Sequence, residues 1–407
     1  MKSCCEPNPK LNDISAMKQL LGRVVKAMPQ TLDLGQALGR VLAQDVIATR
    51  DSPACDVSAM DGYAVKISEL PTAGQIRVCG ELAIGQKPEA REPLQVMKIF
   101  TGGPAPAWVD AVVKREDTLE GDGVMSLKMT PEQIIKGQHI RRQGENVKAQ
   151  EKILSKGQRI DSAAAGVLAT FGYDQVLVYA KLKIGILTTG NELKKVNQKT
   201  SDWEIRDSNA YAIKAMFANT QWATVLIHQH AIDDLEHTQQ CLKHLLETVD
   251  VLLVTGGVSM GDHDHVPRAI QNIGGEIIFH KLNIRPGKPL LGAVAAEGKK
   301  IIMGLPGNPV SAMVTARRFA VEAMRKMAGF LDHEICDAMV ELLPCAQDKK
   351  LNLHSFRPAK IQPSGQAKII KTQGSGDLIA VANSDGFVYI PAGEMPAGIR
   401  AFYRWSL

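Results

Sequence analysis

The 407-residue sequence lacks several features that would assign it to a specialised class of protein. It has no apolar run long enough to span a bilayer, and its first residues lack the apolar core of a secretory signal, so we expect a cytoplasmic protein that does not engage the membrane. Its seven cysteines are odd in number and scattered, which disfavours a zinc site or a disulfide framework. It also has no long run of Lys or Arg, and we therefore expect no nucleic-acid partner.

What is present is the composition of an ordinary globular protein, with 45% hydrophobic and 22% charged residues. A chain of this length is too long for a single core, so two to four domains are expected. The net charge of +5 is mild for this size and indicates anionic small molecules at most.

The pattern along the chain predicts a multidomain α/β plus β fold. Strands and helices alternate in the third quarter of the chain, which predicts a central three-layer α/β domain with a parallel-rich sheet. The predicted domains are a discontinuous, elongated helical linker domain at 1–45 and 142–180, an inserted β-rich domain at 46–141, the α/β domain at 181–330 and a small C-terminal β domain at 331–407.

The stretch 251–264 is the most informative in the chain. Its first four residues show no polar alternation, which is typical of a strand buried on both faces. Gly256 and Gly257 then allow a positive φ and leave backbone N–H groups to cradle phosphate. Asp262 and Asp264 follow, and carboxylates beside a phosphate site commonly hold a divalent cation. An ordinary strand-to-helix loop with an Asp cap explains the same residues at this point.

Three polar loops follow predicted strands of the α/β domain, at 189–193, 255–259 and 304–309. Ligands in such sheets bind at the carboxyl ends of the strands. The loops are therefore expected to form one shared site.

Two further places carry polar residues beside apolar strands. In the β-rich domain these residues are Asp61 and Thr101, although a hairpin turn at Asp61-Gly62 accounts for the first equally well. In the C-terminal domain they are Arg357 and Ser375, for which a structural role is the alternative.

Seven motifs in this order resemble the molybdopterin molybdenumtransferase family, the MoeA-type enzymes that also correspond to the E domain of gephyrin. The likeness runs from about residue 11 to the C-terminus. The motifs are Ser58-Ala-Met-Asp-Gly-Tyr-Ala64, Thr101-Gly-Gly103, Thr189-Gly-Asn-Glu-Leu193, Asp207-Ser-Asn209, Thr255-Gly-Gly-Val-Ser-Met-Gly-Asp-His-Asp264, Arg285-Pro-Gly-Lys-Pro289 and Gly304-Leu-Pro-Gly-Asn-Pro309.

The resemblance implies an enzyme that inserts molybdate into adenylated molybdopterin, releases AMP and forms the molybdenum cofactor with the help of Mg²⁺. It implies catalytic roles for Asp61, Glu192, Asp262 and Lys288, and metal binding by Glu192, Asp262 and Asp264. The residues expected to bind cofactor or substrate are Thr101, Thr255, Gly256, Gly257, Ser259, Arg285, Pro306, Asn308, Arg357 and Ser375.

The resemblance also implies a homodimer in which Asp61 and Thr101 of one subunit reach the site of the other. A molybdopterin adenylyltransferase is a candidate partner, and the sequence leaves open whether it hands over the intermediate directly. Arg285 and Asn191 depart from the family pattern, in which Lys and Asp are common at these places. Loss of the Asp charge predicts weaker binding of the metal.

Two other functions fit parts of the sequence. A non-catalytic pterin-binding scaffold could keep the fold, but the acidic residues Asp61, Glu192, Asp262 and Asp264 speak against a purely structural role. A molybdopterin adenylyltransferase would share the Thr-Gly-Gly loop within a single α/β domain. The additional β domains favour the insertion step.

Overall fold

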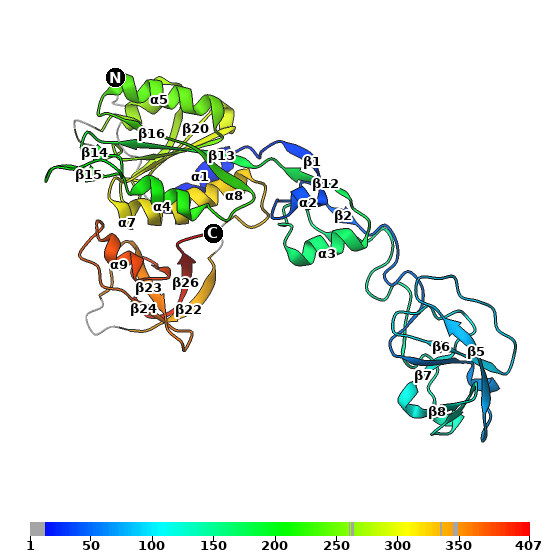
Figure 1. Cartoon of the computed structure of the whole chain (residues 1–407). Coiled ribbons are helices and arrows are strands. Elements are labelled where there is room, and N and C mark those ends of the chain that lie inside the picture. Colours follow the sequence, from blue (N-terminus) through cyan, green and yellow to red (C-terminus); the bar gives the residue numbers. More distant parts are fainter. Residues whose placement is uncertain (1–12, 260, 262–263, 334–335, 345–348) are drawn as a thin grey trace. The chain divides into compact units, whose positions relative to one another are not determined.

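The computed structural model of the chain describes residues 13–259, 261, 264–333, 336–344 and 349–407 (Figure 1). The chain forms two compact units. The smaller unit comprises Asp45–Ser155 and Val167–Tyr173, and the larger unit comprises the remaining residues. The finer division into four domains stays a prediction.

A mixed six-stranded sheet forms the centre of the larger unit. Its strand order is β16 (Ala223–Ala231), β13 (Leu182–Thr189), β17 (Val251–Thr255), β21 (Lys300–Leu305), β20 (Leu291–Ala295) and β18 (Glu276–His280). The first four strands are parallel to one another, as the alternation of strands and helices predicts.

Helices cover both faces of this sheet, which confirms the predicted three-layer α/β arrangement (Figure 1). One face packs against α1 (Ala16–Arg23), α4 (Asn209–Met216), α7 (Pro309–Thr315) and α8 (Val321–Met327), and the other packs against α5 (Leu235–Thr248) and α6 (Val266–Asn272). In β17, Val251 and Leu253 belong to the first core, whereas Leu252 and Val254 belong to the second. Burial of each such apolar side chain stabilises the folded state by roughly 1.5–3 kcal/mol.

The last two strands of the sheet run antiparallel to their neighbours, which the sequence patterns do not predict. Strand β20 pairs antiparallel with β21, and β18 pairs antiparallel with β20. Only residues 296–299 connect β20 to β21. A connection this short can form a hairpin but cannot cross over to a parallel strand.

The C-terminal part of the larger unit is a small closed barrel. Its strands are β22 (Ala338–Leu342), β23 (His354–Ile361), β24 (Ala367–Ile369), β25 (Gly386–Ile390) and β26 (Gly398–Arg404), with the short helix α9 (Leu378–Ala382) between β24 and β25. Pairing of β23 with β25 closes the barrel, so that it has no open edge. Strand β19 (Ile284–Arg285) comes from the α/β part and pairs with the start of β23.

The segment predicted as a helical linker contains strands as well as helices. Strand β1 (Pro29–Asp33) pairs antiparallel with β12 (Gln175–Tyr179), and the short helix α2 (Leu34–Ala37) follows β1. Helix α3 (Ser162–Thr170) contributes residues to both compact units. The helical spacing of apolar residues at 11–28 predicts one long N-terminal helix, but the structure has only the shorter α1 there. Residues 11 and 12 lie outside the described part of the chain.

The smaller unit is built on a second six-stranded sheet. Its strand order is β7 (Ala111–Lys114), β4 (Gly62–Val65), β6 (Gln95–Ile99), β5 (Ile76–Leu82), β9 (Val124–Leu127) and β8 (Thr118–Gly121). Two short pairs complete the unit: β3 (Val57–Ser58) with β10 (Ile140–Arg141), and β2 (Val46–Ile47) with β11 (Lys152–Leu154). All four residues of β4 are buried, with Tyr63 and Val65 in one core and Ala64 in another.

Within the described part of the chain, no helix combines the length and the apolar character that a membrane crossing needs. Four of the cysteines lie in this part, and all four are free thiols. Two of them, Cys79 and Cys241, are shielded, and burial raises the pKa of both thiols.

Replacing Gly62 by Ala should destabilise the smaller unit. A Cβ at this position would lie 1.9 Å from the carbonyl oxygen of Val113 on β7, so the two strands would have to move apart. We expect a loss of roughly 2 kcal/mol or more, measured by thermal unfolding and by hydrogen exchange of residues 62–65 and 111–114. Gly121→Ala is the matched control, because a Cβ there meets nothing within 4 Å. Equal stability of the two variants would contradict this account.

Candidate functional site

The turn that follows β17 requires glycine for two reasons. Gly256 and Gly257 adopt φ values of +88° and +63°, which residues other than glycine rarely adopt. A Cβ on Gly256 would also lie 2.7 Å from the carbonyl oxygen of Thr189 on β13. The turn therefore packs directly against the end of the neighbouring strand.

The backbone of this turn is only partly available for a ligand. The amide of Gly256 donates to the carbonyl oxygen of Leu305 at 3.2 Å, so this N–H group does not have the freedom that phosphate binding would need. His280 supports the turn from outside, with Nε2 lying 2.6 Å from the carbonyl oxygen of Val258. Burial lowers the pKa of His280, which favours the neutral ring.

A cavity of about 500 Å³ opens beside the glycine turn, and we call it the acidic cavity. Three carboxylates line it, from Glu192, Asp233 and Asp264, whereas none of the described lining residues is Lys or Arg. The loops that follow β13, β16, β17 and β21 form most of its walls. The lining residues are Thr189, Gly190, Glu192, Leu193, Ile205, Asn209, Asp233, Thr255, Gly256, Gly257, Val258, Ser259, Asp264, Pro289, Pro306, Gly307, Asn308 and Pro309.

Two of the three carboxylates of the acidic cavity, those of Asp233 and Asp264, accept hydrogen bonds from backbone amides. Asp264 accepts a hydrogen bond from the amide of Gly261 at 2.6 Å. Asp233 and Asn191 form a reciprocal pair: the amide of Asn191 donates to Asp233 at 3.0 Å, and the amide of Asp233 donates to the side-chain oxygen of Asn191 at 3.1 Å. This pair joins the loop after β13 to the loop after β16.

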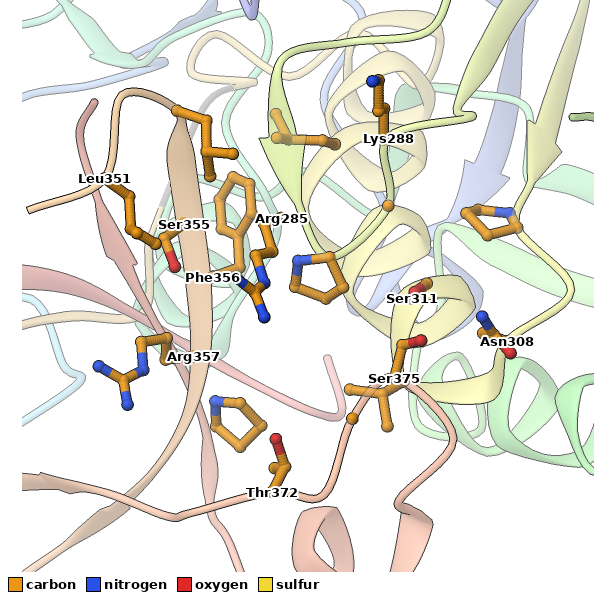
Figure 2. Close-up of a pocket in the computed structure, with 18 of the residues that line it drawn as sticks. Arg285, Lys288, Asn308, Ser311, Leu351, Ser355, Phe356, Arg357, Thr372 and Ser375 are labelled. Atoms are coloured by element: carbon orange, nitrogen blue, oxygen red, sulfur yellow. The ribbon is translucent and has the colours of Figure 1, made fainter. Parts of the chain in front are cut away.

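A larger cavity of about 750 Å³ lies next to the acidic one, and we call it the basic cavity. Arg285, Lys288, Arg357 and Lys371 line it, and none of its described lining residues is Asp or Glu. Figure 2 shows Arg285 pointing into the space between β23, which carries Phe356, and α7, which carries Ser311. The hydroxyl-bearing residues that also line it are Ser311, Ser355, Thr372 and Ser375.

The pairing of two short segments places Arg285 near the strand position of Arg357. In the pairing of β19 with β23, Arg285 lies beside Ser355, two residues before Arg357. The two cavities also share part of their walls, because Pro289, Pro306 and Asn308 line both. An acidic space and a basic space therefore meet at the loop 304–309.

In the smaller unit, Asp61 and Thr101 contact each other directly. Oδ1 of Asp61 accepts hydrogen bonds from the backbone amide of Thr101 at 2.8 Å and from its hydroxyl at 2.9 Å. These two bonds, with a contribution from the charge of Arg115, lower the pKa of the exposed Asp61 carboxyl. Asp61 is thus an ionised, oriented carboxylate at physiological pH.

The donor set of the acidic cavity suits a hard divalent cation. Mg²⁺ prefers oxygen ligands and is commonly held by one or two carboxylates together with substrate phosphates. Glu192, Asp233 and Asp264 supply such oxygens. The described residues contain no group of three or more His, Cys, Asp or Glu side chains close enough to hold a metal by themselves. Asp262, one of the predicted ligands, lies outside the described residues.

Most predicted site residues of the larger unit line one of the two cavities. The acidic cavity contains Glu192, Thr255, Gly256, Gly257, Ser259 and Asp264, the basic cavity contains Arg285, Lys288, Arg357 and Ser375, and Pro306 and Asn308 line both. Asp61 and Thr101 lie in the other compact unit.

Several lining residues are absent from the predicted set. Asp233 follows β16, so the rule that ligands bind at the carboxyl ends of strands identifies it once that strand is included. Asn209 lies in the Asp207-Ser-Asn209 motif, which carried the family resemblance without a role in the site. Ser311, Lys371 and Thr372 carry no sequence signal, since only the closed barrel and the start of α7 place them in the basic cavity.

Comparisons with known proteins agree along nearly the whole chain. Residues 13–172 match the family described as MoeA N-terminal region (domain I and II), and residues 185–326 match the probable molybdopterin binding domain. A protein of Synechococcus elongatus named molybdopterin molybdenumtransferase is 33% identical over 395 residues, which cover 93% of this chain and 95% of that protein. A Staphylococcus aureus protein of the same name is 30% identical, with coverage of 93% and 92%.

Solved structures agree on the fold. A molybdopterin biosynthesis MoeA protein from Pyrococcus horikoshii has a TM-score of 0.76 and 25% sequence identity, and the match covers 95% of this chain and 98% of that one. A second structure of this kind has a TM-score of 0.77 at 23% identity. These likenesses confirm the predicted multidomain α/β plus β architecture.

Replacing Thr101 by Val should raise the pKa of Asp61. Valine keeps the backbone N–H but removes the hydroxyl that donates to the carboxylate, so part of the stabilisation of the ionised form is lost. The carboxyl group would then protonate at a higher pH, and any activity that needs Asp61 ionised would be lost earlier on acidification. A carbon-detected NMR titration of Asp61 measures this shift. Thr72→Val, in an exposed loop of the same unit, should leave the pKa unchanged.

Proposed function

We propose that this chain, which belongs to the molybdopterin molybdenumtransferase family, inserts molybdate into adenylated molybdopterin, releases AMP and so forms the molybdenum cofactor. The chain is a transferase of molybdenum cofactor biosynthesis, and the proposal concerns the form of its substrate and the reaction at the site. The observation that carries it is the meeting of an acidic and a basic cavity at Pro289, Pro306 and Asn308.

The acidic cavity is the proposed place for the phosphates of the adenylated pterin and a divalent cation such as Mg²⁺. Glu192 and Asp264 would hold the cation together with Asp233, and Asp262 is assigned to the same set by the family resemblance. When bound, the cation would neutralise phosphate charge and polarise the bond to the leaving AMP. A site lined by carboxylates and lacking a described Lys or Arg needs such a cation before it can accept a phosphate.

The basic cavity is the proposed place for molybdate. An oxyanion is bound well by guanidinium, ammonium and hydroxyl donors, which Arg285, Lys288, Arg357 and Ser375 offer. Arg285 takes the place where Lys is common in the family, and its planar guanidinium can donate two parallel hydrogen bonds to one anion. Lys288 is the proposed catalytic cation, beside the wall shared by the two cavities.

Asp61 and Thr101 are proposed to complete the site across a homodimer. The hydrogen bonds from Thr101 keep Asp61 ionised and oriented, as a residue that contacts substrate would need to be. In a shared site of this kind, each catalytic centre takes residues from two subunits. A molybdopterin adenylyltransferase is the proposed source of the adenylated substrate, and the cytoplasm is the proposed location.

An assay with two substrate mixtures separates this function from its two alternatives. We expect formation of molybdenum cofactor and AMP from adenylated molybdopterin plus molybdate with Mg²⁺, and no adenylation of molybdopterin by ATP. Turnover only in the mixture of molybdopterin and ATP would identify an adenylyltransferase. Binding of molybdopterin without turnover in any mixture would identify a scaffold.

Asp61→Asn should abolish molybdenum insertion while leaving pterin binding intact, because the side chain keeps its size but loses its charge.

Co-expression of Asp61→Asn with Glu192→Gln tests the shared site. If each centre takes Asp61 from one subunit and Glu192 from the other, mixed dimers contain one intact centre, and activity returns to about a quarter of the wild-type value. If both residues act within one subunit, each mixed dimer contains two damaged centres and activity stays absent.

A further inference from the structure

The Asp207-Ser-Asn209 motif has no role in the function proposed above, although it lies beside the acidic cavity. Asp207 is buried and accepts hydrogen bonds from Nε2 of His228 on β16 at 3.0 Å and from the amide of Ala210 at 3.1 Å. Burial opposes ionisation of Asp207, but these bonds outweigh it and keep the pKa of the carboxyl below its usual value. The start of α4 is thereby tied to the central sheet.

Asn209, the first residue of α4, connects this anchored segment to another loop. Its side-chain Nδ2 donates to the carbonyl oxygen of Gly307 at 2.8 Å. The Gly307 carbonyl fixes the orientation of the amide, since the opposite orientation would place two acceptor oxygens against each other. Oδ1 of Asn209 is buried and has no hydrogen-bond partner among the described residues.

The hydrogen bond from Asn209 to Gly307 affects both cavities. The neighbours of Gly307, Pro306 and Asn308, line the acidic cavity and the basic cavity alike. A Cβ on Gly307 would lie 3.6 Å from Cα of Gly256, so the loop 304–309 packs against the glycine turn. The position of Gly307 therefore determines where the two cavities meet.

We propose that Asn209 is a positioning residue whose hydrogen bond to Gly307 fixes the wall shared by the two cavities. On the proposed function, this wall sets the alignment of molybdate in the basic cavity with the pterin intermediate in the acidic one. Reaction rates depend steeply on such alignment, and a misplacement of about 1 Å can cost on the order of 100-fold. The groups proposed to bind the cation and molybdate are other side chains, namely the carboxylates of the acidic cavity and the cations of the basic cavity.

The test compares Asn209→Ala and Asn209→Asp with the wild-type chain. The Ala variant removes the donor. The Asp variant keeps the size of the side chain and places a carboxylate oxygen against the Gly307 carbonyl, while an acidic residue in the first turn favours the helix, so folding is retained. Asn383→Ala is the matched control, because Nδ2 of Asn383 makes a similar bond of 2.9 Å to the carbonyl oxygen of Ile379 outside both cavities.

We expect kcat to fall about 10- to 100-fold in both Asn209 variants. In Asn209→Ala, which adds no charge to the acidic cavity, KM for molybdate and for adenylated molybdopterin should change less than about threefold. Hydrogen exchange of residues 304–309 should accelerate in both Asn209 variants and not in the control. An unchanged kcat in folded variants would overturn the proposal. A rise in KM with kcat unchanged would also overturn it, because that result indicates direct substrate binding by Asn209.

Two readouts keep this proposal separate from the proposed function. Hydrogen exchange of residues 304–309 and calorimetric binding of molybdate do not require turnover. If the wild-type chain shows no molybdenum insertion, the proposed function fails, and faster exchange in Asn209→Ala still supports the hydrogen-bonded wall. If exchange at 304–309 is unchanged in both Asn209 variants, the positioning role fails whatever the activity of the wild-type chain.

Discussion

The close packing of two turns, at Gly256 and Gly307, is the constraint on which both cavities depend. The first turn follows β17 and packs against the carbonyl group of Thr189. The second turn follows β21 and packs against the first. Because β13, β17 and β21 are adjacent and parallel, their ends meet at one edge of the sheet. A Cβ on Gly256 would collide with the carbonyl oxygen of Thr189, whereas a Cβ on Gly307 would only reach contact distance from Gly256. Glycine at position 256 is therefore what allows the strand ends to form a single continuous wall.

The wall shared by the two cavities separates the carboxylates of the acidic cavity from the cations of the basic cavity. Carboxylates on one side would repel an oxyanion, and cations on the other side would repel a metal ion. On the proposed function, the adenylated substrate with its cation and a free oxyanion would therefore occupy neighbouring spaces without exchanging places. The shared residues Pro289, Pro306 and Asn308 are uncharged, which lets the two spaces meet without an ion pair that would neutralise both.

The sequence predicts the larger unit well where the signal is local. Unbroken apolar residues at 251–254 identify the central strand, and strand–helix alternation identifies the layers and the loops at their ends. It does not predict the antiparallel strands β18 and β20, because apolar strand patterns are the same in both directions. Nor does it predict the basic cavity as a unit, since Arg285 and Arg357 are brought together by the pairing of β19 with β23. Pairing between distant segments leaves no trace in either segment alone.

Asn191 illustrates how a departure from a family pattern changes meaning once contacts are known. The missing charge predicts a weaker metal site, yet Asn191 is not among the described residues that line the acidic cavity. Its oxygen and its backbone amide instead form the reciprocal pair with Asp233. A carboxylate at position 191 could accept the same hydrogen bond but would place a second negative charge beside Asp233. The neutral amide keeps the two loops joined without that repulsion, and it leaves the cavity's charge to Glu192, Asp233 and Asp264.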